Sequence, residues 1–363
     1  MTAIRSCSTL LPDCRPLLAD PDDLTLVFQP IVDLAAARVA GYEALSRFPG
    51  TASPEVWFAA AHDAGVGPEL EALALHKALA ARVDLPPDTF LTVNVSPHLL
   101  GTPVVGAALD SVPDLRRVVV ELTEHAVVDD VPELRRQVDL LRARGALIAL
   151  DDAGSGYWGL RVLTSVRPQL VKLDRSLVSD VDGDPARLAL AEMVGDFAGR
   201  IDARLLAEGI ETPAELAAFT RLGAPLAQGW LLGRPAPQFR PLAPEVERLV
   251  RAHVARARLT DSVAGLVRPV RQVAAGDAVP GIPPAVLVTD DGEPLALRLG
   301  DPRTGECYTA PVSLRVPPDA DVRQTLQRAL TRSPGQRFDP VVCTDARGAV
   351  VGLLRVEDLA GAS

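Results

Sequence analysis

Eight short apolar segments, most of them separated by longer amphipathic stretches, constrain the fold of this chain more than any other feature. They cover residues 26–32, 39–45, 90–96, 118–123, 146–151, 170–174, 204–208 and 227–232. Strands that alternate with helices form α/β folds, and eight strands suit a closed barrel. Only residues 33–38 separate the first two segments, too few for a parallel crossover. The sequence therefore predicts an α/β fold, a (β/α)8 TIM-like barrel with one antiparallel strand in a hairpin.

Local helix signals lie between these segments. Ser53-Pro54 can open one helix, and residues 212–215 form a capping box with Pro213 at the first helical position. A stripe of apolar residues at helical spacing consists of Leu134, Val138 and Leu141. These signals predict helices between the strands, as the α/β pattern requires.

The length of 363 residues and an apolar content of 48% allow two globular domains. We expect a lead-in segment over residues 1–22, the barrel over 23–243, a linking helix over 244–260 and a smaller α+β domain over 261–363. The smaller domain has two similar halves. In each half an apolar run, 285–289 or 341–344, is followed by a turn and a return run. This pattern predicts an internal pseudo-repeat.

Charge and cysteine usage narrow the function classes. The formal net charge of −10 argues against broad electrostatic binding to DNA or to anionic membranes. Cys7, Cys14, Cys307 and Cys343 lack metal-type spacing and are interpreted as reduced. No apolar stretch approaches the roughly 20 residues that span a bilayer. We therefore expect a cytoplasmic protein that does not enter the membrane.

Acidic and amide residues stand at or near the ends of several apolar segments, where the carboxyl ends of barrel strands would meet. They are Glu43, Asn94, Glu121, Glu124, Asp151, Asp152 and Glu208. So many carboxylates at one rim repel unless cations neutralise them, and all-oxygen ligands favour Mg²⁺ or Mn²⁺. Lys172 ends its own segment, and we interpret it as a candidate to hold a phosphate oxygen or to handle a proton.

Each acidic residue also has a simpler interpretation. A single carboxylate at a strand end is more often a helix cap or a solvated loop residue, and Asp129-Asp130 fits that description. Glu211 and Glu215 could serve only the following helix, and Asp174 could merely pair with Arg175 or Lys172. The number of strands that end in acids favours a site over this alternative.

Short motifs follow one another in the order of a known family. They read FQPIVDL at 28–34, EALSR at 43–47, NVS at 94–96, ELTE at 121–124, DD at 151–152, KLD at 172–174, AEGIE at 207–211 and QGW at 228–230. Over roughly residues 24–240 the chain resembles an EAL domain. The resemblance implies hydrolysis of cyclic di-GMP to linear pGpG, two Mg²⁺ or Mn²⁺ ions as cofactors, and a homodimer.

The resemblance also assigns roles by motif position. Metal binding is assigned to Glu43, Asn94, Glu121, Asp151, Asp152 and Glu208. Catalytic roles are assigned to Lys172, Glu43, Gln228 and Glu211, with Gln228 near the attacking water. Substrate contacts are assigned to Gln29, Leu45, Arg47 and Asp174, with Arg47 on a phosphate. Support of a flap over the substrate is assigned to Glu124, Gly154, Ser155 and Gly156.

Some positions depart from the family pattern. Ala153 stands where an aromatic residue is usual, and Trp158-Gly159 replaces a small hydroxylic pair. Gln169 replaces a common acid, a change that could alter how a guanine is held. The flap changes bear on rate and regulation, and they leave open a cyclic di-GMP receptor with weak or no activity. An unrelated metal-dependent barrel hydrolase would explain the acids but not the ordered motifs.

The C-terminal domain carries a weaker resemblance. Residues 352–358, GLLRVED, resemble the nucleotide-binding turn of a CBS pair, although Arg355 replaces the usual hydroxyl residue. The resemblance implies a regulatory domain that binds an adenine nucleotide. A structural or dimerising role is an equally open alternative.

Overall fold

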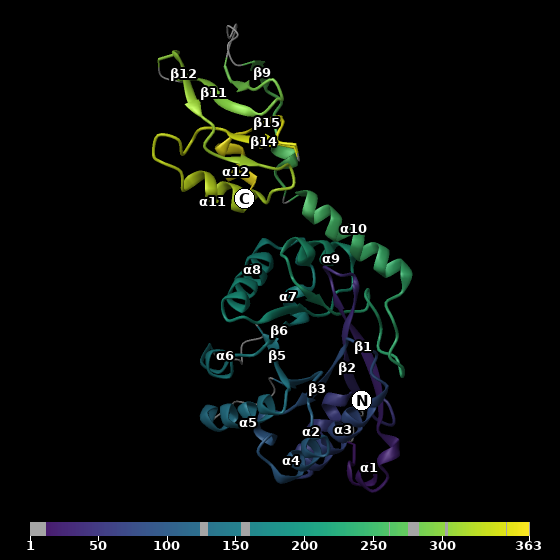
Figure 1. Cartoon of the computed structure of the whole chain (residues 1–363). Helices are drawn as coiled ribbons and strands as arrows, with labels where there is room; N and C mark the ends of the chain where they lie inside the picture. Colours follow the sequence, from purple (N-terminus) through teal and green to yellow (C-terminus); the bar gives the residue numbers. More distant parts are fainter. Residues whose placement is uncertain are drawn as a thin grey trace, which may run out of the picture. The chain divides into compact units, whose positions relative to one another are not determined.

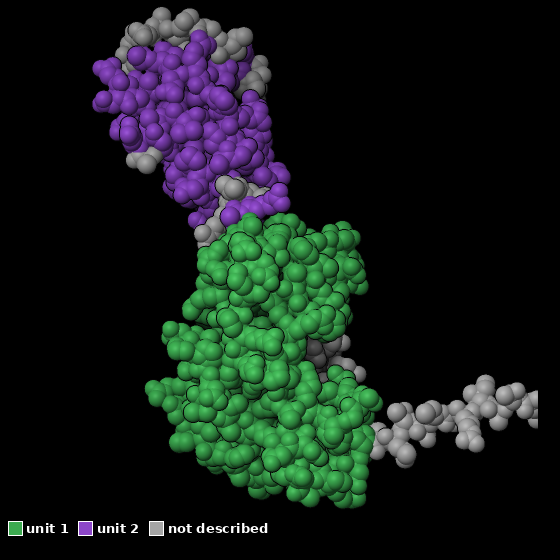
Figure 2. Space-filling view, turned by 90° about the vertical axis from the view of Figure 1, so that its right-hand side faces the viewer, with its two compact units in different colours: residues 1–254 green, residues 255–363 purple. Residues whose placement is uncertain are grey.

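The computed structural model describes residues 12–123, 130–153, 160–260, 262–274, 283–301, 304–345 and 347–362. The chain divides into two compact units, residues 1–254 and 255–363, which Figure 2 shows in green and purple. Each unit has its own buried apolar clusters.

The first unit is a closed barrel of eight strands in chain order (Figure 1). The strands are β1 (Thr25–Asp33), β2 (Arg38–Arg47), β3 (Phe90–Val95), β4 (Val118–Leu122), β5 (Leu147–Ala153), β6 (Leu170–Leu173), β7 (Arg204–Ala207) and β8 (Leu226–Ala227). Strand β1 is antiparallel to both β2 and β8, and the other neighbours are parallel. The predicted barrel and its antiparallel hairpin are confirmed.

The prediction for the eighth strand was wrong over most of its length, because the strand covers only Leu226–Ala227. The chain then turns and bonds to the loop after β7: Ile210 donates its N–H to the carbonyl of Gln228, and Leu231 donates to the carbonyl of Ile210. Leu232 is apolar because it is buried in the core, not because it lies in a strand.

Helices surround the barrel. They are α2 (Pro54–Asp63), α3 (Gly67–Ala81), α4 (Pro103–Asp110), α5 (Val131–Ala143), α6 (Leu160–Val166), α7 (Arg175–Val178), α8 (Pro185–Arg200) and α9 (Pro213–Arg221). The capping box predicted at the start of α9 is present, with Thr212 and Glu215 bonded reciprocally. The predicted apolar stripe of α5 is buried, and Asp130 caps this helix by accepting the N–H of Glu133. These local signals are confirmed because they depend only on neighbouring residues.

An apolar floor fills the barrel interior below the strand ends. It consists of Ile31, Val119, Ala149, Leu170, Leu206 and Leu226, with Phe90 packed against it. The Phe90 ring occupies the space that a side chain at Gly41 would need, since an added Cβ would lie 2.4 Å from the ring. This packing makes the lower barrel largely apolar, and the inward-facing acids of the described strands sit at the carboxyl ends.

Residues 12–22, which we expected to be a lead-in of doubtful order, pack onto the barrel unit. They contain α1 (Arg15–Ala19) and the start of η1 (Pro21–Asp23). Cys14 and Leu17 are buried in one cluster with Trp57 and Leu70. These small apolar contacts give the segment a fixed place that its mixed composition did not suggest.

The helix α10 (Pro244–Thr260) follows the barrel at the predicted linking position. In the second unit, one sheet contains β9 (Arg271–Ala274), β10 (Ala285–Val288), β11 (Pro294–Gly300) and β12 (Cys307–Pro311). The other contains β13 (Arg315–Val316), β14 (Val341–Thr344) and β15 (Val350–Leu354). Helices α11 (Val322–Leu330) and α12 (Val356–Ala362) complete the unit.

The two halves of the second unit share one strand pattern. In each, a strand pairs in parallel with the first strand of an antiparallel hairpin: β9 with β10–β11, and β13 with β14–β15. The halves differ after the hairpin, because β12 follows β11 whereas α12 follows β15. The pseudo-repeat is therefore present in the strands but not in all the connections.

Over the residues described above, no helix combines the length and the apolar character that crossing a membrane requires.

We predict that Gly229→Ala destabilises the barrel unit. An added Cβ would lie 2.1 Å from the Ile210 carbonyl oxygen and 2.2 Å from the Ile210 nitrogen. These backbone atoms are held by the two hydrogen bonds described above, so they cannot move aside without breaking them. The free energy of unfolding should fall by about 1–3 kcal/mol or more, measured by urea denaturation.

Gly106→Ala is the matched control. Gly106 lies inside α4, where an added Cβ meets nothing within 4 Å. Replacement by alanine in a helix should raise the free energy of unfolding by about 0.5–1 kcal/mol. Equal effects of the two substitutions would contradict our account of the Gly229 contact.

Candidate active site

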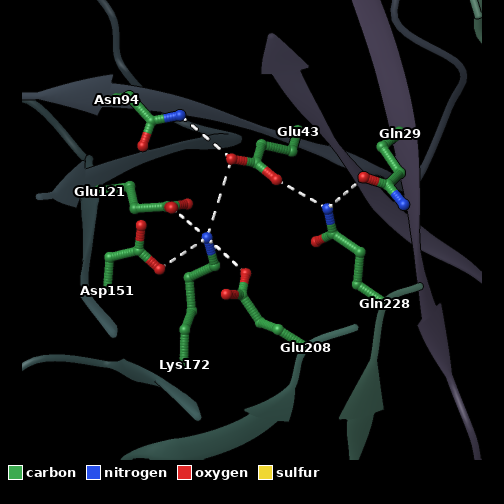
Figure 3. Close-up of polar contacts among 8 residues, drawn as sticks. All are labelled: Gln29, Glu43, Asn94, Glu121, Asp151, Lys172, Glu208 and Gln228. Carbon is green, nitrogen blue, oxygen red and sulfur yellow. Dashed lines mark hydrogen bonds and ion pairs between the residues drawn. The ribbon is translucent and has the colours of Figure 1, made fainter. Parts of the chain in front are cut away.

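Lys172 lies at the centre of four carboxylates inside the mouth of the barrel (Figure 3). Its Nζ atom lies 2.6 Å from Glu208 Oε1, 3.0 Å from Asp151 Oδ1 and 3.7 Å from Glu43 Oε1, and it also contacts Glu121 Oε1. The lysine side chain is only 2% exposed. The five residues lie on, or directly after, five different strands, so only the closed barrel brings them together.

Among the four carboxylates, Glu43 also accepts hydrogen bonds from amide side chains at both of its oxygens. Asn94 Nδ2 donates to Glu43 Oε1 at 3.1 Å, and Gln228 Nε2 donates to Glu43 Oε2 at 2.6 Å. Gln228 Nε2 also donates to Gln29 Oε1, and Gln29 Nε2 donates to the carbonyl of Gly233. Glu43 is therefore fixed in orientation by a chain of buried amides.

Burial dominates the electrostatics of the cluster. It raises the pKa of Glu121 and of Glu208 well above the ordinary value, and the neighbouring acids Asp151 and Glu43 raise both further, against the opposing charge of Lys172. For Lys172 burial opposes the charged form, but the surrounding carboxylates outweigh it and raise the lysine pKa. These carboxylates favour the charged form of Lys172, which donates a hydrogen bond to Glu121.

The donor set fits a divalent cation. Glu121, Asp151 and Glu208 each offer a carboxylate oxygen, and the three oxygens lie within 4.8 Å of one another. Glu121 Oε2 is buried and has no hydrogen-bond partner within the described part of the chain. Four carboxylates face one ammonium group, so the cluster carries excess negative charge, and oxygen donors of this kind suit Mg²⁺ or Mn²⁺.

The residues assigned to substrate contact lie at different places around this cluster. Leu45 and Arg47 lie near the end of β2, and both are half-buried. Arg47 donates to the carbonyl of Ser46, and no carboxylate of the described residues lies within ion-pair distance of it. Asp174 follows β6 and caps α7, accepting the N–H of Ser176 at 2.9 Å. Gln29 is instead engaged by protein groups at both amide atoms, as described above.

Glu211 was expected among the catalytic residues, but its carboxylate lies 2.7 Å from Arg175 Nη2 and makes no contact with Lys172. Glu215 serves the loop: its Oε2 accepts the N–H groups of Glu211 and Thr212. Of the two acids, Glu215 thus fulfils the capping role that the sequence left open for both, whereas Glu211 forms an ion pair with Arg175, the first residue of α7.

Several predicted residues lie outside the described parts of the chain. These are Glu124, Gly154, Ser155 and Gly156, together with Trp158 and Gly159. Asp152 and Ala153 belong to β5, but their side chains are likewise outside the described residues. The expectations for the flap and for Asp152 therefore remain predictions.

Sequence reasoning missed an aromatic group beside the site. Trp230 is 49% exposed, and the guanidinium carbons of Arg234 and Arg175 lie 4.2 and 5.7 Å from its ring centroid. Arg175 is also the partner of Glu211. Trp230 was visible in the QGW motif, but one arginine neighbour, Arg175, begins α7, and no local sequence pattern joins it to Trp230.

The expectation that the change at Gln169 could alter how a guanine is held is not supported by the position of this residue. Gln169 precedes β6, and its Oε1 accepts the backbone N–H of Ile148 at 3.0 Å. This contact lies at the amino ends of the strands, opposite the carboxylate cluster. Gln169 therefore ties two neighbouring strands together at the bottom of the barrel.

Fold and site together define an α/β barrel with a buried polyacidic site at the carboxyl ends of its strands. The family model of the EAL domain matches residues 17–235, more than half of the chain. The chain belongs to the EAL family. The match ends before the second unit begins.

Known proteins share this part of the chain. The probable cyclic di-GMP phosphodiesterase PdeI of Escherichia coli K12 is 28% identical over 230 residues, which are 59% of this chain and 29% of PdeI. The chain thus spans less than a third of the length of this relative.

Solved structures show the same fold. Klebsiella pneumoniae BlrP1, in a calcium and cyclic di-GMP complex, is 31% identical with a TM-score of 0.55, covering 60% of this chain and 57% of BlrP1. A manganese complex of BlrP1 is similarly close. The standalone EAL protein of Vibrio cholerae O395, bound to cyclic di-GMP, is 27% identical with a TM-score of 0.54, covering 62% of this chain and 97% of that protein.

We predict that Glu121→Gln stabilises the metal-free protein. The pKa of Glu121 is raised above its ordinary value of 4.5, so the folded state holds a proton that the unfolded state releases. Stability therefore falls as the pH rises above that value, and the uncharged amide removes this loss. At neutral pH the gain should be about 1 kcal/mol, or about 2–4 °C in Tm.

Thermal melts from pH 5 to pH 8, with and without Mn²⁺, check this prediction. The advantage of the variant should grow with pH when the metal is absent. Added Mn²⁺ should raise the Tm of the wild-type protein but not that of the variant, because one carboxylate of the donor set is lost. If the variant is less stable than the wild type without metal at neutral pH, excess negative charge in the cluster does not destabilise the metal-free protein, and the prediction is wrong.

Proposed function

We propose that this chain is a metal-dependent phosphodiesterase that hydrolyses cyclic di-GMP to linear pGpG. The observation that carries the proposal is the convergence of four carboxylates and two amides around Lys172 at the mouth of an EAL barrel. The proposal is supported by cyclic di-GMP in the similar complexes of BlrP1 and of the Vibrio cholerae protein.

Two Mg²⁺ or Mn²⁺ ions would be held by the oxygen donors Glu43, Asn94, Glu121, Asp151 and Glu208, with Asp152 added by its motif position. Such ions stabilise developing charge on phosphoryl oxygens and lower the pKa of a coordinated water. Of these donors, Glu43 is preorganised, because Asn94 and Gln228 donate to its two oxygens.

The remaining residues would orient the substrate. Arg47 carries a guanidinium group near the end of β2 that forms no ion pair with a described carboxylate, which suits it to a phosphate of cyclic di-GMP. Lys172, as an ammonium group, would donate hydrogen bonds to a water or a phosphate oxygen. We also propose Leu45 and Asp174 as substrate contacts. Gln29 acts through Gln228, which it holds against Glu43.

Glu43→Ala should lower kcat/KM for cyclic di-GMP by at least about 100-fold. The substitution removes a donor oxygen and the acceptor of both Asn94 and Gln228. Glu55→Ala is the control, because Glu55 is an exposed acid on α2 that forms no ion pair with Lys172. The measurement is chromatography of the linear product, with Mg²⁺ and with Mn²⁺.

The product assay, together with a measurement of cyclic di-GMP binding, separates the phosphodiesterase from a receptor and from an unrelated hydrolase. Tight binding of cyclic di-GMP without turnover in the wild-type protein would make the chain a receptor. Failure to bind cyclic di-GMP at all would favour a different barrel hydrolase. Equal activity of the wild type and Glu43→Ala would show that the carboxylate cluster is not the reaction site.

For the second unit we propose a regulatory role exerted through assembly into a homodimer. Asp358, in the turn that resembles a CBS pair, is engaged by the protein itself: Arg268 Nη2 donates to its Oδ1 at 2.8 Å, and Arg268 Nε lies 2.8 Å from its Oδ2. An adenine nucleotide at this turn would have to displace Arg268. This ion pair competes with a nucleotide at the turn, and assembly is the alternative role that we propose.

Calorimetric titration of the full chain with ATP and AMP should therefore give no heat of binding, and sedimentation should show a dimer. Arg268→Ala is the informative variant, because it releases Asp358 without touching the barrel. Nucleotide binding by the wild-type protein would replace the assembly role with a nucleotide-sensing one. A monomer that binds no nucleotide would contradict both.

A further inference from the structure

A buried carboxylate outside the cluster, Glu71, is not used by the proposed mechanism. It lies on α3, on a helix face that is otherwise apolar, and is only 5% exposed. Its Oε1 accepts the backbone N–H of Ser96 at 2.7 Å. A buried carboxylate is costly, so its presence in an apolar layer calls for a specific partner.

The partner of Glu71, Ser96, lies directly after the end of β3. The next residue, Pro97, begins a short 3-10 helix over Pro97–Leu99. The Ser96 N–H would otherwise be a backbone donor at a strand end packed beneath α3, and such donors are rarely left unpaired. Glu71 thus fixes the point at which β3 leaves the barrel.

Asn94 stands two residues before this anchor. Side chains alternate along β3, so Val93 and Val95 pack into the outer core with Leu75 and Leu79 of α3 while Asn94 faces the interior. Asn94 donates to Glu43, and it is the residue of β3 proposed as a metal ligand. A shift of the strand end would move the Asn94 amide relative to Glu43.

We propose that Glu71 is a positioning residue of the metal site, which holds the end of β3 through Ser96 so that Asn94 keeps its place beside Glu43. This inference rests on the proposed function, since it takes Asn94 as a metal ligand. Supporting groups of this kind commonly govern metal affinity without contacting the metal.

The chemistry of Glu71 suggests the conservative replacement. Burial raises the pKa of Glu71 to about 7, against the lowering effect of the hydrogen bonds from Ser96. An oxygen of the side chain can accept the Ser96 N–H in either protonation state. Glutamine keeps an acceptor oxygen of the same reach, whereas alanine leaves the N–H without a partner.

The experiment compares three variants of the full chain by calorimetric titration with Mn²⁺. Glu71→Ala should lower the Mn²⁺ affinity by about 10–100-fold, and Glu71→Gln should keep it close to the wild-type value. Saturating Mn²⁺ should restore most of the turnover of Glu71→Ala, because the chemistry itself is unchanged.

Leu75→Ala is the matched structural control. Leu75 lies one turn further along the same helix and is 2% exposed, so its truncation destabilises the same layer without touching Ser96. Thermal melts establish that all variants are folded at the temperature of the titration. Leu75→Ala should lose stability and keep its Mn²⁺ affinity.

The outcomes separate the two ideas. Wild-type affinity in a folded Glu71→Ala protein, or an equal loss of affinity in Leu75→Ala, would overturn the positioning role and leave the proposed function intact. No Mn²⁺ binding by the wild-type protein would overturn the proposed function, and this inference with it.

Discussion

Four carboxylates around one buried lysine, two of them buried and two half-buried, are the constraint on which the rest of the barrel unit depends. Their charges repel, and burial makes the repulsion worse, so each must be held where an opposing charge or a hydrogen-bond donor is in reach. Lys172 supplies the charge, and Asn94 and Gln228 supply donors to Glu43. The result is a cluster that destabilises the fold locally and that bound cations, as we propose, would stabilise.

The scaffold meets this constraint by rigid packing from two sides. Below the site, the barrel interior is filled by the apolar floor, which includes Ile31 and Leu206. Outside it, helices such as α3 cover the strands, and Glu71 secures the exit of β3. Because close-packed interiors transmit small shifts, a change well outside the cluster can alter its geometry. Support and chemistry are therefore separable roles carried by different residues.

Much of the fold could be predicted because its signals are local. The apolar segments located the strands, the six-residue connection indicated the β1–β2 hairpin, and the capping box at Thr212 marked the start of α9. The predictions were wrong where apolar residues are buried outside regular strands, or where a segment of mixed composition packs into the core. The apolar run after Ala227 is a packed turn rather than a strand, and the N-terminal segment around Leu17 joins the core despite its mixed composition.

The sequence by itself determined which strands carry acids and placed the chain beside a family through the order of its motifs. Only the tertiary structure decided which side chains meet. Lys172 contacts residues up to 129 positions away in the chain, and Gln29 reaches Gln228 across the closure of the barrel. It also separated Glu211, which pairs with Arg175, from the cluster. The physical reason is that motif order reports strand ends, whereas side-chain pairing depends on barrel closure and on competition among charged neighbours.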